Sequence, residues 1–339
     1  MKSLKTNLIT GILCLFAISV SLISCNDDDA SSTGPVVENV SLAQNDSLVE
    51  FGYADNMYII RGKGFSNTQK IYFNNVDTYF NSTLVTDNVI IVTIDRNTPY
   101  ENTTNELRIA TTNGSVTYPF VVAPPAPAIK SFNPINPAAG DVITITGSYF
   151  LDPQVDFGGI AGEVISSTLT QIKVKVPEGA NHKYVRVTTI SGKGRSWEAV
   201  GTALFDDVWY NGWYPEANVT STTSTDTRQG GVYLKSENGG WSGNQFRDIN
   251  WGTIDITPYK GIRFSIKGEA AGKIALIING KWADAESIPV TITTEWQDIE
   301  IPFSQFPFEV TGFQSLVIKE FTGSAAVYHV DDIGLVLKD

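Results

Sequence analysis

Short runs of β-branched and aromatic residues recur along the chain, and this pattern restricts the fold more than any other feature. Examples lie at residues 56–61, 70–73, 88–94 and 106–110, and Gly, Asn, Asp and Pro separate them. The segment 171–177 alternates strictly, with apolar side chains facing a core and lysines facing water. Helical periodicity is hard to find. We therefore expect an all-β chain built from antiparallel sandwiches.

An internal repeat divides the first two thirds of the chain. Residues 58–65 match residues 143–150 at a spacing of 85, and the second copy reads Ile-Thr-Ile-Thr-Gly-Ser-Tyr-Phe after a Gly-Asp turn. The pattern resembles the IPT/TIG immunoglobulin-like family, closely at 127–200 and more weakly in the first copy. The resemblance implies two spacer domains, 38–123 and 127–202, joined by a proline-rich linker that is semi-rigid.

Residues 203–339 differ in composition from the preceding part of the chain, and they contain enough predicted strands for a jelly roll. The segments 204–207, 254–264, 296–303 and 328–333 resemble, in that order, the carbohydrate-binding-module jelly rolls of the galactose-binding-like superfold. The expected fold class is therefore all-β, with two immunoglobulin-like β-sandwiches followed by a β-jelly-roll domain.

The N-terminus is typical of an exported protein. Two lysines precede an apolar run, and residues 1–24 form a predicted signal peptide that is too short for a stable membrane span. The sequence Leu-Ile-Ser-Cys resembles a bacterial lipobox, which implies lipidation of Cys25 and anchoring in a lipid bilayer. The acidic run at 26–29 resembles the Bacteroidetes signal that places lipoproteins on the outside of the cell outer membrane, and 25–37 would be a lipidated tether.

The tryptophans indicate where a ligand binds. All seven lie at or after residue 197. A pyranose ring packs its C–H face on a flat aromatic side chain, and its hydroxyls need polar partners that fix its orientation. Glycine-rich and turn contexts around Trp241 and Trp282 favour exposed loops. Each tryptophan could instead be a core anchor, as we expect for Trp197 and Trp296. The predicted carbohydrate-binding residues are Trp241, Trp282, Trp251, Trp213, Asn244, Arg247 and Lys281.

Two acidic pairs lie at the first and last strands of the jelly roll. In the family that these strands resemble, such strands are neighbours and often share a structural Ca²⁺, an ion that needs several oxygen ligands. The resemblance therefore implies a possible structural calcium at Asp207 and Asp331. No other cofactor is required by any motif. The alternative is that these carboxylates are simply solvated at strand ends.

Composition and motifs argue against several classes of function for this chain. A formal net charge of −12 makes a nucleic-acid partner unfavourable. The chain has no recognisable catalytic motif, so we expect no enzyme activity. The layout resembles surface glycan-binding lipoproteins of Bacteroidetes polysaccharide-utilisation systems, which implies binding of a polysaccharide or oligosaccharide, β-glucan or another plant-type glycan, and supply to an outer-membrane importer complex. The alternatives are an adhesin acting through the immunoglobulin-like domains and a glycoside hydrolase.

Overall fold

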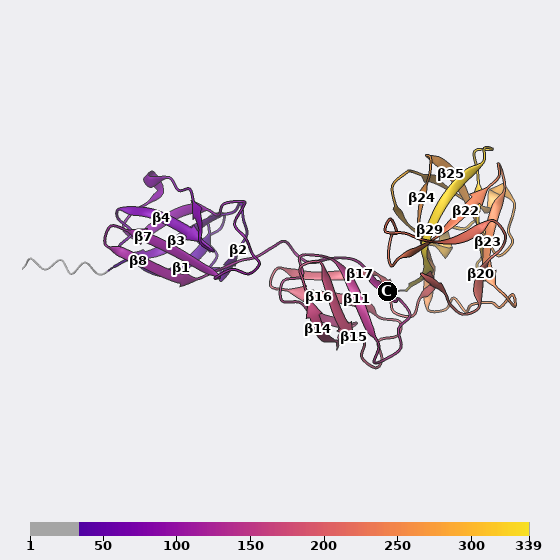
Figure 1. Ribbon diagram of the computed structural model, residues 1–339, viewed down its shortest axis with the longest axis horizontal. Helices are drawn as coiled ribbons and strands as arrows, with labels where there is room; N and C mark the ends of the chain where they lie inside the picture. Colours follow the sequence, from indigo (N-terminus) through magenta and orange to yellow (C-terminus); the bar gives the residue numbers. More distant parts are fainter. Residues whose placement is uncertain (1–33, 339) are drawn as a thin grey trace, which may run out of the picture.

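The computed structural model describes residues 34–338, which form three β-domains in a row (Figure 1). The predicted signal peptide, Cys25 and most of the predicted tether lie outside the described residues. Within them, strands dominate and the helical elements are single 3₁₀ turns, such as η1 (Ser82–Leu84). No described helix has the length and apolarity needed to span a membrane. The predicted all-β fold class is confirmed.

The first domain is a sandwich of two antiparallel sheets. One sheet has the order β1 (Val36–Leu42), β3 (Met57–Lys63), β6 (Val89–Thr93). The other has the order β5 (Val76–Thr78), β4 (Thr68–Phe73), β7 (Glu106–Thr111), β8 (Gly114–Pro119). A short parallel pair, β2 (Phe51–Gly52) with β9 (Val121–Val122), completes the domain. Its first strand begins at Val36, two residues before the predicted boundary.

The middle domain repeats this plan. One sheet has the order β10 (Ala128–Asn133), β11 (Val142–Ser148), β15 (Gln171–Lys175), β14 (Glu163–Ser167). The other has the order β13 (Ile160–Ala161), β12 (Gln154–Phe157), β16 (Tyr184–Thr189), β17 (Gly192–Ala199). In both copies the repeated glycine is required by close packing. A Cβ on Gly62 would lie 1.9 Å from the Val36 carbonyl oxygen, and one on Gly147 would lie 2.1 Å from that of Ala128.

The jelly roll consists of two sheets that enclose the largest core of the chain. The first sheet contains β19 (Val208–Trp209), β18 (Ala203–Asp206), β29 (Ala326–Leu337), β22 (Val232–Asn238) and β21 (Val219–Thr223), and β24 (Tyr259–Gly268) pairs with β29 and β27 (Gln297–Pro302). The second is five-stranded, with the order β20 (Trp213–Pro215), β23 (Gly243–Asp248), β28 (Ser315–Glu320), β25 (Gly272–Ile278), β26 (Ile288–Ile292).

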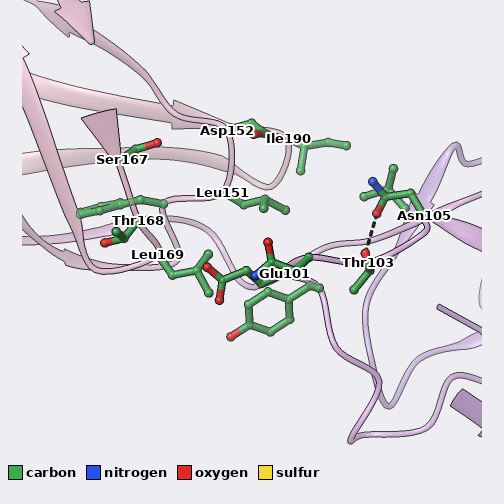
Figure 2. A pocket seen from close by; sticks show the side chains of 13 residues that line it. Glu101, Thr103, Asn105, Leu151, Asp152, Ser167, Thr168, Leu169 and Ile190 are labelled. Carbon is green, nitrogen blue, oxygen red and sulfur yellow. Dashed lines mark hydrogen bonds between the residues drawn. The ribbon is translucent and has the colours of Figure 1, made fainter. Parts of the chain in front are cut away.

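The joint between the first and middle domains is loosely packed. A cavity of about 380 Å³ separates their loops, with Glu101 and Thr103 on one side and Asp152, Thr168 and Ile190 on the other. Figure 2 shows that the hydrogen bond drawn there, from Thr103 to Asn105, stays within the first domain. Few contacts across a joint are typical of domains that move relative to each other.

The joint between the middle domain and the jelly roll is instead closed by buried polar contacts. The side chain of Asn136 makes a reciprocal pair with the backbone of Ala203, at 2.9 and 3.0 Å. Arg228 of the jelly roll donates to the Lys130 carbonyl at 2.9 Å. The Tyr259 hydroxyl lies 3.1 Å from His182 Nε2. These hydrogen bonds pair backbone groups across the boundary between the two domains. We call the middle domain and the jelly roll together the head.

A fully buried charge network lies inside the same joint. Arg263 of β24 forms an ion pair with Asp332 of β29, and Trp197 of the middle domain lies 5.4 Å from the guanidinium. Glu198, also from the middle domain, is buried beside Asp332. Burial raises the pKa of Glu198 well above its usual range, and the neighbouring Asp332 charge adds to this.

The stability of the head is expected to fall as pH rises from about 5 to about 8. Burial raises the pKa of Asp206 to about 7 and that of Asp331 to about 8, compared with 3.8 for the free side chain. A carboxyl group with a raised folded-state pKa contributes stability that is fully present below its unfolded pKa and is lost as pH rises through the folded value. Urea unfolding followed by tryptophan fluorescence at pH 5, 6, 7 and 8 measures the change. The variant Asp206→Asn should flatten this slope, and an unchanged slope would contradict the assignment.

Candidate functional site

The five-stranded sheet has one face in the core of the jelly roll. On its other face the central strands are covered, with Val317 of β28 and Ile277 of β25 buried, and the partly exposed side chains lie on β20, on β23 and at Lys319. Phe246 of β23 and Leu316 of β28 pair in register and lie in the core. Because successive side chains of a strand point to opposite faces, Gln245 and Arg247 of β23 point outward. Tyr214, which pairs with Arg247, extends this outward row onto β20. We call the surface that carries Tyr214, Gln245, Arg247 and Lys319 the outer face. The sheet of β20 and β23 lies on the side of the jelly roll away from the middle domain (Figure 1).

The structure corrects the prediction for Trp213. Its side chain is only 2% exposed, and its ring stacks on that of Phe313 with centroids 5.2 Å apart. Trp213 therefore anchors the core and offers no surface to a ligand. The next residue, Tyr214, points outward instead. The sequence placed two aromatic residues side by side on one strand, and alternation alone does not say which of them faces the core.

Trp213→Ala and Tyr214→Ala are expected to have opposite effects. The first opens a cavity in the core and should cost about 3–5 kcal/mol of the free energy of unfolding. The second should leave thermal stability nearly unchanged and weaken glycan binding about tenfold. Thermal unfolding and titration calorimetry on the two variants separate the roles. A stable Trp213→Ala protein with weakened binding would overturn this placement.

Arg247 contacts two aromatic rings, so its guanidinium is not free for a ligand. Its guanidinium lies 4.0 Å from the centre of the Trp251 ring and 4.9 Å from that of Tyr214. Its Nε donates to Glu216 at 2.7 Å, and the side chain is largely covered. Cation–π contacts of this kind fix the orientation of the rings. The structure thus gives Arg247 a positioning role, in place of the predicted direct contact with sugar hydroxyls.

Asn244 was also predicted to contact hydroxyls, and the structure contradicts this. It lies on the same side of β23 as Phe246 and is buried. Its amide nitrogen donates to Ser236 Oγ at 2.8 Å and to Asn238 Oδ1 at 3.1 Å. These bonds satisfy a buried amide that links the two sheets. The alternation with Phe246 was the sequence signal that could have shown this.

Two exposed tryptophans follow strands that end at the same end of the five-stranded sheet. Trp251 follows β23 and is 52% exposed, and Trp282 follows β25 and is 49% exposed. Both strands run antiparallel to β28, so they run parallel to each other and their ends lie at the same end of the sheet. One strand separates them, which places the strand ends about 10 Å apart. Large aromatic side chains left in water can hold the rings of a saccharide chain.

The loop that carries Trp282 is fixed against the sheet by ion pairs. Asp284 of η2 (Asp284–Glu286) accepts from Lys319 Nζ at 3.1 Å, and Lys319 stands on the outer face. Lys281 is half exposed, 3.8 Å from Glu286, and its ammonium lies 5.5 Å from the centre of the Phe308 ring. Lys281 thus lies on the surface beside Trp282, and its predicted contact with sugar hydroxyls stays a prediction.

Trp241 lies at the opposite end of β23 from Trp251. It precedes β23, next to the end of β28, and is 57% exposed. Its ring makes an edge contact with Phe321, with centroids 5.6 Å apart. A six-residue strand is about 20 Å long, so Trp241 is separated from Trp251 by roughly that distance. The sequence grouped these tryptophans, and the structure divides them.

Other tryptophans serve the packing of the molecule. Trp296 was expected in the core but is half-buried, and its Nε1 donates to Asp226 at 3.2 Å. Trp209 stacks on Phe246 at 5.9 Å, at the edge of the core.

Asp207 and Asp331 do not fit a calcium site. Both Asp331 oxygens accept backbone N–H groups, Oδ2 from Arg228 at 3.0 Å and Oδ1 from Asp332 at 2.7 Å. Asp207 Oδ1 accepts from Gly231 and Val232 at 2.8 and 2.7 Å. These donors compete with a cation for the same lone pairs. Among residues 34–338, no three His, Cys, Asp or Glu side chains form a group that could hold a metal ion. The two carboxylates instead secure the loop before β22.

Two family models match the chain. Residues 127–199 match the IPT/TIG domain, and residues 187–336 match carbohydrate binding domain 30. Both resemblances inferred from the sequence are thereby confirmed. The second match begins within β16, so it includes the end of the middle domain as well as the jelly roll.

Individual proteins are also similar. An IPT/TIG domain-containing protein of Bacteroides ovatus is 32% identical over 164 residues, 45% of this chain and 32% of that protein. The chain therefore spans about a third of the length of this curated relative. Among solved structures, surface glycan-binding protein PbSGBP-B of Prevotella bryantii has a TM-score of 0.50 at 17% identity, covering 89% of this chain and 98% of that one. SGBP-B from a xyloglucan utilisation locus of Bacteroides uniformis has a TM-score of 0.39 at 15% identity, covering 90% and 100%.

Proposed function

We propose that this chain is a non-catalytic surface glycan-binding protein whose ligand lies across the outer face of the jelly roll. The observation that carries the proposal is the exposure of Trp251 and Trp282 in the loops that follow β23 and β25, with Arg247 joining Trp251 to Tyr214. The match to carbohydrate binding domain 30 supports it. Flat aromatic surfaces suit extended chains, so the ligand class is β-glucan or another plant-type polysaccharide.

The charged groups around the tryptophans support binding without catalysis. Hydrolysis of a glycoside needs two carboxyl groups that face each other across the scissile bond. The acids near these aromatic residues all have partners. Glu216, Asp284 and Glu286 each form an ion pair with a lysine or arginine, and Asp248 accepts the backbone N–H groups of Asn250 and Gly252. Carboxylates held in this way position side chains and loops, which supports a binding role.

The domain order supports a role at the cell surface. The jelly roll lies at the end of the molecule farthest from Val36, where the described chain enters the first domain (Figure 1). With a lipid at Cys25, the two sandwiches would hold the binding face away from the outer membrane. Captured glycan would then be supplied to an importer and hydrolase system in the same membrane.

Affinity electrophoresis of residues 25–339 tests the proposal. Gels would contain xyloglucan, mixed-linkage β-glucan, xylan or galactomannan, and bovine serum albumin would serve as the non-binding control. We expect retardation in at least one gel, with no release of reducing sugar after overnight incubation with that polysaccharide. Unretarded migration in every gel would refute glycan binding, and progressive release of sugar would show a hydrolase instead.

A further inference from the structure

A second hollow of the jelly roll lies at the end of β23 opposite Trp251. It is a groove of about 1110 Å³, and its walls come from three places. These are the end of β22, the turn between β24 and β25, and the loop between β28 and β29. The groove opens between the two sheets, so its ligand would not cover the outer face.

Trp241 adjoins this groove, although its own side chain is not among those that line it. Its indole lies against Gly323, where an added Cβ would come 2.7 Å from the indole nitrogen. The neighbours of Gly323 on either side, Thr322 and Ser324, both line the groove. Gly239, two residues before Trp241, lines it as well. The exposed indole and the groove therefore belong to one surface.

The loop that carries Trp241 is held in a fixed, unusual conformation. Trp241 has a φ of 60°, a left-handed value that is uncommon outside glycine and needs support from its surroundings. Glu320, which is fully buried at the end of β28, supplies that support. Its carboxylate accepts the backbone N–H groups of Trp241 at 3.0 Å and Gly323 at 2.8 Å, and that of Thr322. This carboxylate ties the two loops together and holds the indole beside the groove.

The groove offers groups that suit a hydroxyl-rich ligand. Glu237 and Glu269 both line it, and more than half of each side chain is exposed. Carboxylate oxygens accept hydrogen bonds from sugar hydroxyls, and the hydroxyls of Thr322 and Ser324 both donate and accept. Ala270, Ala271 and other small residues leave the space between these groups open.

We propose that this groove, with Trp241 beside it, is a second saccharide-binding site that takes a chain end or side branch of the polysaccharide bound on the outer face. This inference rests on the proposed function. Trp241 beside the groove and Trp251 on the outer face lie about one strand length, roughly 20 Å, apart. A short oligosaccharide therefore occupies one site at a time, whereas a polymer engages both and gains affinity through effective concentration.

The test compares polymer and oligosaccharide binding in three variants of residues 25–339. The probes are the retarding polysaccharide and its tetrasaccharide, both titrated by calorimetry. Trp241→Ala and the groove-filling Ala271→Trp should each lower polymer affinity at least tenfold and change tetrasaccharide affinity less than twofold. Glu320→Gln, which weakens the hydrogen bonds that hold the Trp241 loop, should also lower polymer affinity. Circular dichroism and thermal unfolding confirm that each variant is folded.

The other outcomes overturn the second site. Unchanged polymer affinity in Trp241→Ala excludes it. An equal fall for polymer and tetrasaccharide makes Trp241 a part of the outer-face site. A fall in Trp241→Ala without one in Ala271→Trp excludes the groove. If the unsubstituted protein binds no glycan, the proposed function itself fails, and that result is distinct from all of these.

Discussion

The double variant Trp251→Ala/Trp282→Ala is expected to lose tetrasaccharide binding by about a thousandfold. Truncating an aromatic side chain at the centre of a binding surface typically costs 2 kcal/mol or more, which is about 30-fold in affinity for each residue. Both side chains are about half exposed and make few contacts that the fold needs. The variant should therefore keep its thermal stability while titration calorimetry shows the loss.

Trp296→Ala is the matched control for this experiment. Trp296 is a half-buried tryptophan of the same domain, but it precedes β27 of the other sheet and donates to Asp226. Its removal should leave tetrasaccharide affinity within twofold of the unsubstituted protein. Equal losses in the control and the double variant would mean that the outer face is not the binding surface.

Arg263→Met is expected to destabilise the head by about 3–5 kcal/mol. Arg263 and Asp332 form a fully buried ion pair, and removing one partner leaves the other charge without compensation in a medium of low polarity. Thr202 Oγ1 also loses its contact with the guanidinium at 3.4 Å. Tryptophan fluorescence during urea unfolding measures the effect, because every tryptophan of the chain lies at or after residue 197.

Glu198→Gln is the control at the same joint. Because burial raises the pKa of Glu198 well above its usual range and so disfavours its charged form, an amide of the same shape should cost less than about 1 kcal/mol. The charge-free variant Arg263→Met/Asp332→Leu should recover most of the stability lost by Arg263→Met, since an apolar pair can replace a buried ion pair. Comparable losses in Glu198→Gln and Arg263→Met would contradict the assigned charge states.

Local sequence patterns were sufficient for the fold. The strict alternation at 171–177 marked β15, and its register with β11 places Ile172 and Val174 in the core as the pattern required. The repeat could be recognised because the neighbouring strand lies too close to Gly62 and Gly147 for any side chain, so both positions need glycine. A requirement at a single position of this kind can be seen in the sequence.

The binding surface was only partly predictable for the opposite reason. Glycines beside Trp241 and a turn around Trp282 indicated exposure, and both side chains are exposed. The choice between Trp213 and Tyr214 depended on which face of β20 meets the core, and that follows from its pairing with β23. The division of Trp241 from Trp251 likewise follows from strand direction, which no short segment encodes.

No sequence pattern predicted the buried joint between the middle domain and the jelly roll. Glu198 and Arg263 are 65 positions apart, and each alone is typical of a solvated surface charge. Their burial arises only when the middle domain docks on the jelly roll. The middle domain, predicted as a spacer, is therefore also part of the head that presents the outer face.

The most direct test of the central claim follows the indole N–H signals of the seven tryptophans by NMR during titration with the tetrasaccharide. Our account predicts that the signals of Trp251 and Trp282 shift and saturate together, while those of buried Trp213 and of Trp197 at the joint stay in place. Shifts confined to other tryptophans, or no shift at all at saturating ligand, would contradict it.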